Sequence, residues 1–167
     1  MTLGATAVFA VTAENATSYQ WYYRKSATGT WLTVKEADGK TAQISVTGTA
    51  ANNGYQYRHK VLNGTCYAYS DTVTLKVKPK ITTQPKNKTV VLGATAVFAV
   101  TAENATSYQW YYRKSPTGTW LTVKEADGKT AQISVTGTAT NNGYQYRCKV
   151  MNSAGYVYTN IVTLKVN

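Results

Sequence analysis

The sequence predicts an all-β protein built of two antiparallel β-sandwiches in tandem. One observation is an internal repeat: residues 4–50 match residues 93–139 with a single difference, Ala27 against Pro116. A second is the placing of large residues at every second position, as in half-buried strands, in 18–24 and again in 107–113. The third is a regular succession of such segments and turns without any helical period.

The repeat divides the chain into a first copy, residues 1–79, and a second copy, residues 80–167. Residues 81–85 (Ile-Thr-Thr-Gln-Pro) have no counterpart in the first copy. We therefore expect the first copy to lack its first strand and to leave an open edge, through which the chain could form a dimer. We also expect the chain to be a segment of a longer array, joined in the middle by a semi-rigid Lys-Pro-Lys linker at 78–80.

Each element of the first copy follows from a local pattern. Alternating apolar residues predict the first and last strands, and Trp21 marks the second. Asp38-Gly39 and Asn63-Gly64 are dipeptides typical of tight turns. In the second copy, Pro85 is expected where an edge strand changes sheets, because proline cannot donate a ladder hydrogen bond. The expected strands of the first copy span residues 5–13, 18–24, 31–34, 42–46, 54–61 and 73–77.

The central strands carry aromatic residues on their inward face. Trp21 is expected in the core, opposite a Tyr-rich strand in which His59 also points inward. Cys148 takes the position of His59 in the second copy, whereas Cys66 falls in an expected turn and corresponds to Gly155. A disulfide between the two cysteines would need an inward strand position of one domain to meet a turn of the other. Both thiols are therefore predicted to be unbridged.

Two motifs resemble immunoglobulin domains. Trp21 follows Val11 by ten residues, the spacing between the first Cys and the Trp of that family, and the second copy repeats it. Residues 141–148 (Asn-Asn-Gly-Tyr-Gln-Tyr-Arg-Cys) resemble the family's Asp-x-Gly-x-Tyr-x-Cys, with one extra residue after the Gly. With the closing Val-Thr-Leu-Lys-Val, the chain resembles the immunoglobulin-like repeats of large bacterial cell-surface proteins of the adhesin type.

The resemblance implies two tandem immunoglobulin-like sandwiches that lack the disulfide between strands B and F, because Val11 and Val100 stand at the first cysteine position. It further implies an extracellular location, at a bacterial cell surface or secreted. Members commonly act as stalks and adhesive modules beside other repeats of the same array, and some are attached to enzymes. The expected function is thus a non-catalytic stalk or adhesive segment. One alternative is a glycan- or protein-binding module, and another is an accessory domain of a secreted carbohydrate-active enzyme.

The charge balance points to anionic partners. Lys and Arg outnumber Asp and Glu by 18 to 7, which favours contact with an acidic glycan, a cell-wall polymer or a host protein. The positive charge is spread over both copies, which argues against nucleic acid. Simple solubility through exposed lysines is the alternative explanation. No run of eighteen apolar residues is present, so no membrane insertion is expected.

Outward positions of the central strands would gather cations and aromatic rings on one sheet face. Such a face suits stacking against sugars, binding of acidic glycans or a protein hot spot. Cross-strand pairing that only stabilises the sheet is the alternative. Lys35 and Trp31 would extend the face. The candidate binding residues are Tyr22, Arg24, Arg58 and Lys60 in the first copy and Tyr111, Arg113, Arg147 and Lys149 in the second.

Catalysis is not expected. The chain has one His and only seven carboxylates, and the acidic residues lie beside turns. His59 has no equivalent in the second copy, and Cys148 at an inward strand position is predicted to be an inert small hydrophobe. There is no Gly-rich phosphate loop and no cluster with the spacing of metal ligands. No catalytic residue, metal or cofactor is therefore predicted.

Overall fold

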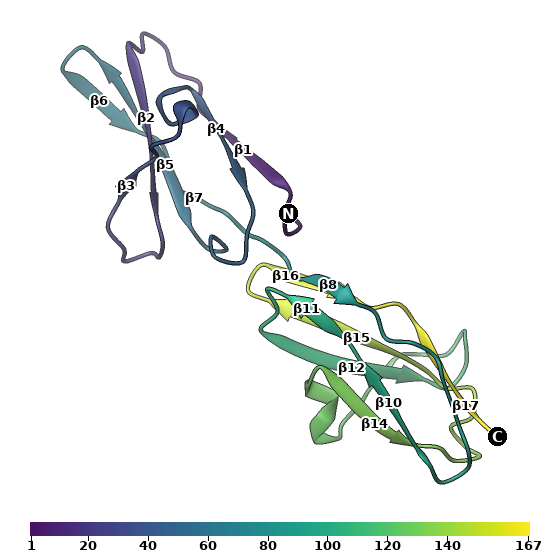
Figure 1. Ribbon diagram of the computed structural model, residues 1–167. Helices are drawn as coiled ribbons and strands as arrows, with labels where there is room; N and C mark the ends of the chain where they lie inside the picture. The colour runs from purple at the N-terminus through teal and green to yellow at the C-terminus, as the bar shows by residue number, and fades with distance from the viewer. The chain divides into compact units, whose positions relative to one another are not determined.

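The computed structural model describes residues 1–167 as two compact units, Met1–Val77 and Lys78–Asn167 (Figure 1). The border lies two residues before the one expected between 79 and 80. Both units are built of strands, with one short 3₁₀ helix in each, and the all-β class is confirmed. No helix has the length and apolar character needed to cross a membrane.

The N-terminal unit, here unit 1, holds two layers. One layer pairs β1 with β4, and the other has the order β3-β2-β5-β6, with β7 paired to the other end of β5. A 3₁₀ helix, η1, spans Ala37–Lys40 before β4. The strands are β1 (Thr6–Ala10), β2 (Ser18–Arg24), β3 (Leu32–Thr33), β4 (Gln43–Thr47), β5 (Gln56–Asn63), β6 (Cys66–Tyr69) and β7 (Val73–Thr74).

The C-terminal unit, unit 2, repeats these layers and adds strands at its start. Strands β8 (Lys80–Thr83) and β9 (Lys88–Val90) belong to opposite layers, since β8 pairs with β11 and β9 pairs with β17. Pro85 lies between them, so the expected change of sheet is confirmed. The remaining elements are β10 (Thr95–Ala99), β11 (Thr101–Glu103), β12 (Ser107–Arg113), β13 (Leu121–Thr122), η2 (Ala126–Lys129), β14 (Gln132–Thr136), β15 (Gln145–Asn152), β16 (Gly155–Tyr158) and β17 (Val162–Val166).

The central pair of strands in each unit follows the predicted alternation. In unit 1, β2 and β5 run antiparallel with Trp21 opposite His59 and Tyr22 opposite Arg58. Trp21 and His59 are only 2% and 0% exposed, whereas Arg58 is partly exposed on the other face. Each strand therefore sends one side chain into the sandwich and the next one outward, as a pleated strand requires.

Several local expectations are wrong. Cys66 begins strand β6 and pairs with Asn63, so it does not lie in a turn. The segment around Asp38-Gly39 forms a 3₁₀ helix instead of a tight turn. The strands expected at 5–13, 31–34 and 73–77 are shorter, at Thr6–Ala10, Leu32–Thr33 and Val73–Thr74. Local dipeptide signals mark where the chain bends, but the shape of a bend depends on the packing around it.

The two units differ in how well their cores are closed. Phe98, Val100 and Val150 of unit 2 are 0%, 4% and 0% exposed. Their counterparts Phe9, Val11 and Val61 are only partly buried. No strand within residues 1–77 corresponds to β8 or β9. Fewer apolar atoms leave water when unit 1 folds, so we expect it to be the less stable unit.

His59 and Cys148 occupy equivalent places behind the central Trp. The His59 ring lies 4.5 Å from the Trp21 ring, between centroids, and its Nε2 is 3.2 Å from the Thr41 carbonyl oxygen. Burial lowers the pKa of His59 from 6.5, partly offset by the contact with the Thr41 carbonyl. Burial also raises the pKa of the Cys148 thiol to about 12, against the effect of a backbone hydrogen bond from Gln109.

His59 should make unit 1 sensitive to acid. Because the folded pKa is lowered, the unfolded chain binds the proton more readily than the folded chain. Unit 1 should keep its full stability above about pH 6.5 and lose stability as the pH falls below that value. Hydrogen exchange across a pH series should show residues 1–77 opening before residues 78–167. His59→Cys should reduce this difference, and Cys148→His should transfer the sensitivity to unit 2; equal acid resistance in all three chains would contradict it.

The two free thiols should differ sharply in reactivity. Cys66 is exposed and Cys148 is buried, and neither is in a disulfide. Since the thiolate is the reactive form, the raised pKa and the burial of Cys148 both slow its alkylation. Mass spectrometry after brief treatment with iodoacetamide at pH 8 should find one label, on Cys66, and a second only after denaturation. Rapid double labelling of the folded chain would argue against the buried position of Cys148.

Candidate functional site

The outward face of the sheet β3-β2-β5-β6 stacks cations on aromatic rings. Trp31, just before β3, lies between Arg24 at the end of β2 and Arg58 on β5. The guanidinium carbon of Arg24 is 4.6 Å, and that of Arg58 4.2 Å, from the centroid of the Trp31 ring. Both distances are within the range of an attractive cation–π contact.

The stack continues across β6. The Arg58 guanidinium carbon is also 4.0 Å from the centroid of the Tyr69 ring. Arg58 therefore contacts two aromatic rings, Trp31 next to β3 and Tyr69 on β6. Tyr69 meets Tyr67 edge to face at 5.6 Å between centroids, and Lys60 Nζ lies 4.1 Å from the Tyr67 ring. We call this set the cation–aromatic ladder. It consists, in order, of Arg24, Trp31, Arg58, Tyr69, Tyr67 and Lys60.

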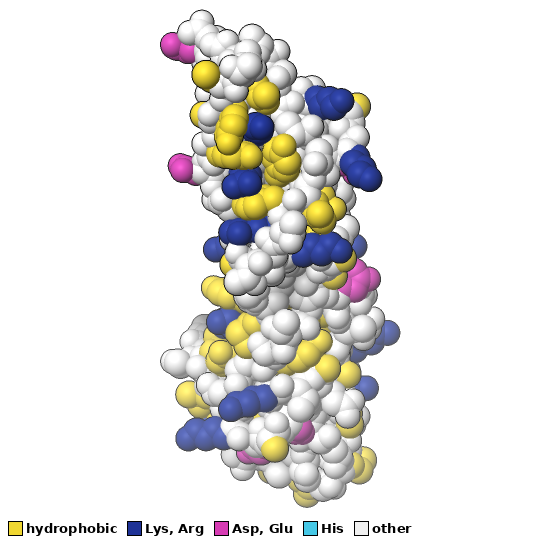
Figure 2. All heavy atoms as spheres, turned by 90° about the vertical axis from the view of Figure 1, so that its left-hand side faces the viewer, with side chains coloured by type: hydrophobic (Ala, Val, Ile, Leu, Met, Phe, Trp, Pro, Cys, Tyr) yellow, Lys and Arg dark blue, Asp and Glu magenta, His cyan; other side chains and the backbone are white.

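Unit 2 carries the same ladder. The guanidinium carbons of Arg113 and Arg147 lie 4.6 and 4.2 Å from the Trp120 centroid. Arg147 lies 4.1 Å from the Tyr158 ring, and Lys149 Nζ lies 4.1 Å from the Tyr156 ring. The ladder of unit 2 consists of Arg113, Trp120, Arg147, Tyr158, Tyr156 and Lys149. Figure 2 shows Lys and Arg side chains set among hydrophobic ones on the unit that holds residues 1–77.

The ladder concentrates positive charge without acidic residues on its own strands. Strands β2, β5 and β6 contain no Asp or Glu, and neither do β12, β15 and β16. Arg24 Nε donates a hydrogen bond of 2.7 Å to Gln56 Oε1, a neutral partner. Arg58 Nε is buried and has no hydrogen-bond partner. Cations held this close repel one another, and a bound anion would relieve that repulsion.

The structure brings the predicted residues of each unit onto one face. Arg24, Arg58 and Lys60 are members of the ladder, and Tyr22 lies at its margin, where its ring meets Tyr69 at 6.3 Å between centroids. The tyrosines of β6 and β16 were not predicted, although their spacing in Tyr-Ala-Tyr and Tyr-Val-Tyr has the period of a strand. Lys35 does not extend the ladder, because it lines a separate hollow.

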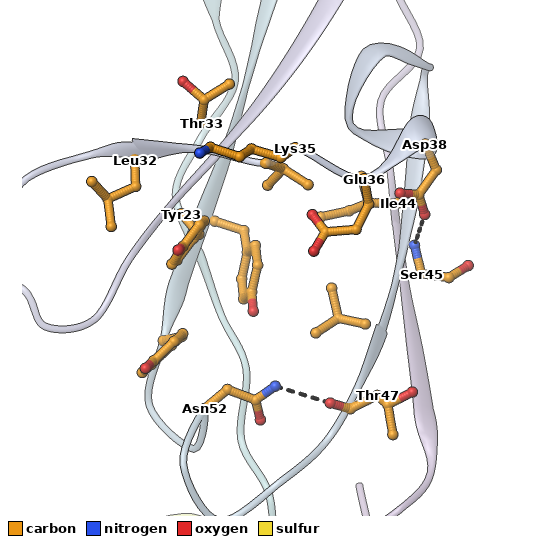
Figure 3. Close-up of a pocket in the computed structure, with 14 residues that line it drawn as sticks. Tyr23, Leu32, Thr33, Lys35, Glu36, Asp38, Ile44, Ser45, Thr47 and Asn52 are labelled. Atoms are coloured by element: carbon orange, nitrogen blue, oxygen red, sulfur yellow. Dashed lines mark hydrogen bonds between the residues drawn. The ribbon is translucent and has the colours of Figure 1, made fainter.

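That hollow is a cleft between the two layers of unit 1, with a volume of about 790 Å³ (Figure 3). Tyr23 and Tyr55 stack on its wall with ring planes 11° apart and centroids 6.0 Å apart. Tyr57 also lines it, and burial, the neighbouring tyrosines and Glu36 together raise the pKa of Tyr57 to about 12. A similar cleft of about 390 Å³ occurs in unit 2, beside Tyr112, Tyr144 and Glu125.

Polar groups of the cleft mainly hold the chain in place. Asp38 Oδ2 accepts a hydrogen bond of 2.8 Å from the Ser45 amide, and Asn52 Nδ2 donates one of 2.9 Å to the Thr47 carbonyl (Figure 3). Glu36 is then the one lining carboxylate without such a bond. No group of three or more His, Cys, Asp and Glu side chains is arranged to hold a metal ion.

Sequence comparison finds similarity to immunoglobulin domains and to one bacterial enzyme. The family model of the immunoglobulin I-set domain matches residues 79–166. Endoglucanase C of Cellulomonas fimi is 37% identical over 90 residues, which make up 53% of this chain but only 8% of that enzyme. The chain therefore spans a small part of this curated relative.

Solved structures with several immunoglobulin domains have a similar fold. A three-domain structure of titin I67–I69, an E-to-A variant, matches with a TM-score of 0.59 at 14% identity, over 100% of this chain and 61% of that one. The four N-terminal immunoglobulin domains of Dscam1 isoform 7.44 match with a TM-score of 0.56 at 17% identity, over 99% and 42%. At such identities the similarity concerns the fold alone.

The ladder should contribute to the stability of its unit. Trp31→Ala removes the ring that both Arg24 and Arg58 contact, and two partly exposed cation–π contacts are together worth about 1–2 kcal/mol. Urea unfolding followed by hydrogen exchange of residues 1–77 should show this loss. Leu32→Ala, which alters the next residue, 42% exposed, should cost clearly less. Equal losses for the two variants would contradict a stabilising role of the ladder.

Proposed function

The chain belongs to the immunoglobulin I-set family, and we propose that it is a non-catalytic, adhesive repeat module of an extracellular bacterial protein. In this proposal each unit binds an anionic glycan or cell-wall polymer through its cation–aromatic ladder. The bacterial and extracellular setting is supported by the similarity to Endoglucanase C of Cellulomonas fimi. A plain stalk, in which the ladder only stabilises the sheet, is the competing explanation.

The observation that carries the proposal is how the two copies differ along one strand. All four residues of β6 are exposed. Two of them differ in the second copy, where Cys66 becomes Gly155 and Ala68 becomes Val157. Tyr67 and Tyr69 are kept as Tyr156 and Tyr158. Retention of the two tyrosines among exposed residues that vary favours a task for their face.

The geometry of the stacked guanidinium suits an anionic group. A guanidinium has all its N–H donors in one plane. The Arg58 guanidinium carbon lies 4.2 and 4.0 Å from the Trp31 and Tyr69 centroids. In this proposal its terminal N–H groups donate two hydrogen bonds to a carboxylate or phosphate. The exposed rings of Tyr67 and Tyr69, 60% and 44% accessible, offer surfaces on which a sugar ring can stack. Charge and stacking together fit an acidic glycan better than a neutral one.

A second candidate function is an accessory domain of a secreted carbohydrate-active enzyme. The 37% identity to a segment of Endoglucanase C supports it. Such a domain would bind the neutral glycan that its enzyme cleaves. Binding of cello-oligosaccharides that does not depend on salt would favour this candidate over the adhesive one.

Ligand binding should depend on the arginines of the ladder and on salt. We expect the whole chain to bind polygalacturonate, and the affinity to fall as salt rises, because exposed charges are screened beyond about 8 Å at physiological ionic strength. Replacing Arg24, Arg58, Arg113 and Arg147 with Ser should weaken binding by about tenfold or more. Tyr22→Ala should weaken binding without changing its salt dependence. Isothermal titration at several salt concentrations measures all three effects.

A charge-matched control separates the ladder from net charge. Lys25, Lys40, Lys114 and Lys129 are exposed and lie outside the ladder, and replacing these four with Ser removes the same charge. This control chain should retain most of its affinity. If the arginine variant binds as well as the unchanged chain, the ladder is not the binding face. If no anionic or neutral glycan binds, the stalk explanation stands.

A further inference from the structure

The tyrosine-lined cleft between the two layers occurs in both units and is built from the same residue types. Each residue that lines the cleft of unit 2 has an identical counterpart, at the equivalent position, in the lining of the cleft of unit 1. The volumes are about 790 Å³ in unit 1 and about 390 Å³ in unit 2. Small-molecule sites in proteins commonly measure about 300–1,000 Å³. The cleft is thus a feature of the repeat and has the size of a site for a small ligand.

One wall of the cleft in unit 1 consists of aromatic rings with free hydroxyls. Tyr23 ends β2 on the inward face, and its ring centroid lies 6.0 Å from that of Tyr55 and 6.3 Å from that of Tyr57. None of the three hydroxyls has a hydrogen-bond partner within the chain. The face of an aromatic ring carries partial negative charge. This wall therefore offers ring faces for a cation or a sugar, together with hydroxyls that can bond to a ligand.

Acidic side chains also line the cleft. Asp38 belongs to η1 and Glu36 precedes it, and Figure 3 shows the Glu36 carboxylate directed into the cleft and the Lys35 amine directed away from that carboxylate. Asp38 already accepts the hydrogen bond from the Ser45 amide. The Glu36 side chain has no such partner. One carboxylate of the cleft is therefore available to a ligand.

The cleft of unit 2 has the same sign of charge. Its lining contains Glu125 and Asp127 but no Lys, Arg or His. After burial and the neighbouring tyrosines, the charge of Glu125 contributes to raising the pKa of Tyr146 to about 12. The whole chain has a net charge of +11, so this cleft is a negative region in a positive protein. Coulomb attraction favours a cationic group there.

We propose that the cleft of each unit binds one residue of an amino sugar with a protonated nitrogen. The ammonium group lies within about 6 Å of a tyrosine ring centroid and forms an ion pair with Glu36 in unit 1 or Glu125 in unit 2. The sugar hydroxyls bond to the free tyrosine hydroxyls, and the apolar face of the sugar packs on the rings. A bare ammonium ion would leave these hydroxyls without partners. The site is separate from the ladder, since Tyr23 points inward and the adjacent Arg24 belongs to the outward face.

Titration with the tetramer of glucosamine tests the proposal directly. Isothermal titration of the whole chain should show saturable binding. The tetramer of N-acetylglucosamine has the same sugar rings without the positive charge. It should bind at least about tenfold more weakly, because the ion pair and the cation–π contact are both lost. Equal affinity for the two tetramers, or no binding of the glucosamine tetramer, would overturn the proposal.

A pair of isosteric variants places the ligand in the cleft. Glu36→Gln together with Glu125→Gln removes the charge and keeps the shape, and should weaken binding of the glucosamine tetramer by about tenfold or more. Glu14→Gln together with Glu103→Gln makes the same change of charge at an equivalent pair outside both clefts, and should preserve the affinity. Equal losses in the two variants would show that only net charge matters and would reject the cleft as the site.

The ladder and a bare cation are tested separately. The chain in which Ser replaces the four ladder arginines should bind the glucosamine tetramer at least as well as the unchanged chain, whether or not the ladder binds an anionic glycan. Tyr55→Phe together with Tyr144→Phe keeps the rings but removes two hydroxyls. This variant should bind the tetramer more weakly and tetramethylammonium unchanged. Tighter binding of tetramethylammonium than of the tetramer by the unchanged chain would reject the amino sugar as the ligand.

Discussion

Each unit depends on one hydrogen-bonded indole that ties its two layers together without a disulfide. Trp21 Nε1 of β2 donates a 3.1 Å hydrogen bond to the carbonyl of Thr41, which leads into β4 of the other layer. Trp110 makes the same bond, of 3.1 Å, to Thr130. The Gln20 amide beside it faces the carbonyls of Val34 and Gly39, which fixes the 3₁₀ helix against β2. Gly39 has no room for a Cβ there, which would lie 2.5 Å from the Val34 carbonyl oxygen.

Features that arise from neighbouring residues could be predicted from the sequence, whereas features that need contacts between distant segments could not. The alternation in β2 and β5 is a local pattern, so the strands, the buried Trp21 and His59, and the outward cations followed from sequence. Tyr67 and Tyr69 have the same period, but the sequence predicts only a turn at Asn63-Gly64 and Cys66 and no strand before residue 73. The cleft beside Tyr23 and Tyr55 was not predictable, since it exists only where two separately formed layers diverge.

The unequal cores of the units show why local sequence cannot decide every strand. The Thr-Ala-Glu of residues 12–14 has the propensity of its copy at 101–103, and pairing with β8 makes the difference. A segment without a partner strand forms no backbone hydrogen bonds between strands, and nothing then offsets the entropy lost when its backbone is fixed. Phe9 is partly buried whereas Phe98 is 0% exposed, although the residues around them in sequence are identical.

The ladder depends on the register of the β5–β6 hairpin. Lys60 and Leu62 of β5 pair with Tyr69 and Tyr67 of β6. Arg58 and Lys60 therefore meet the tyrosine rings on one face of the sheet, Arg58 at Tyr69 and Lys60 at Tyr67. A shift of the register by one residue would turn the side chains of one strand to the other face. The turn that follows Asn63 thus sets the position of the ladder on the whole unit.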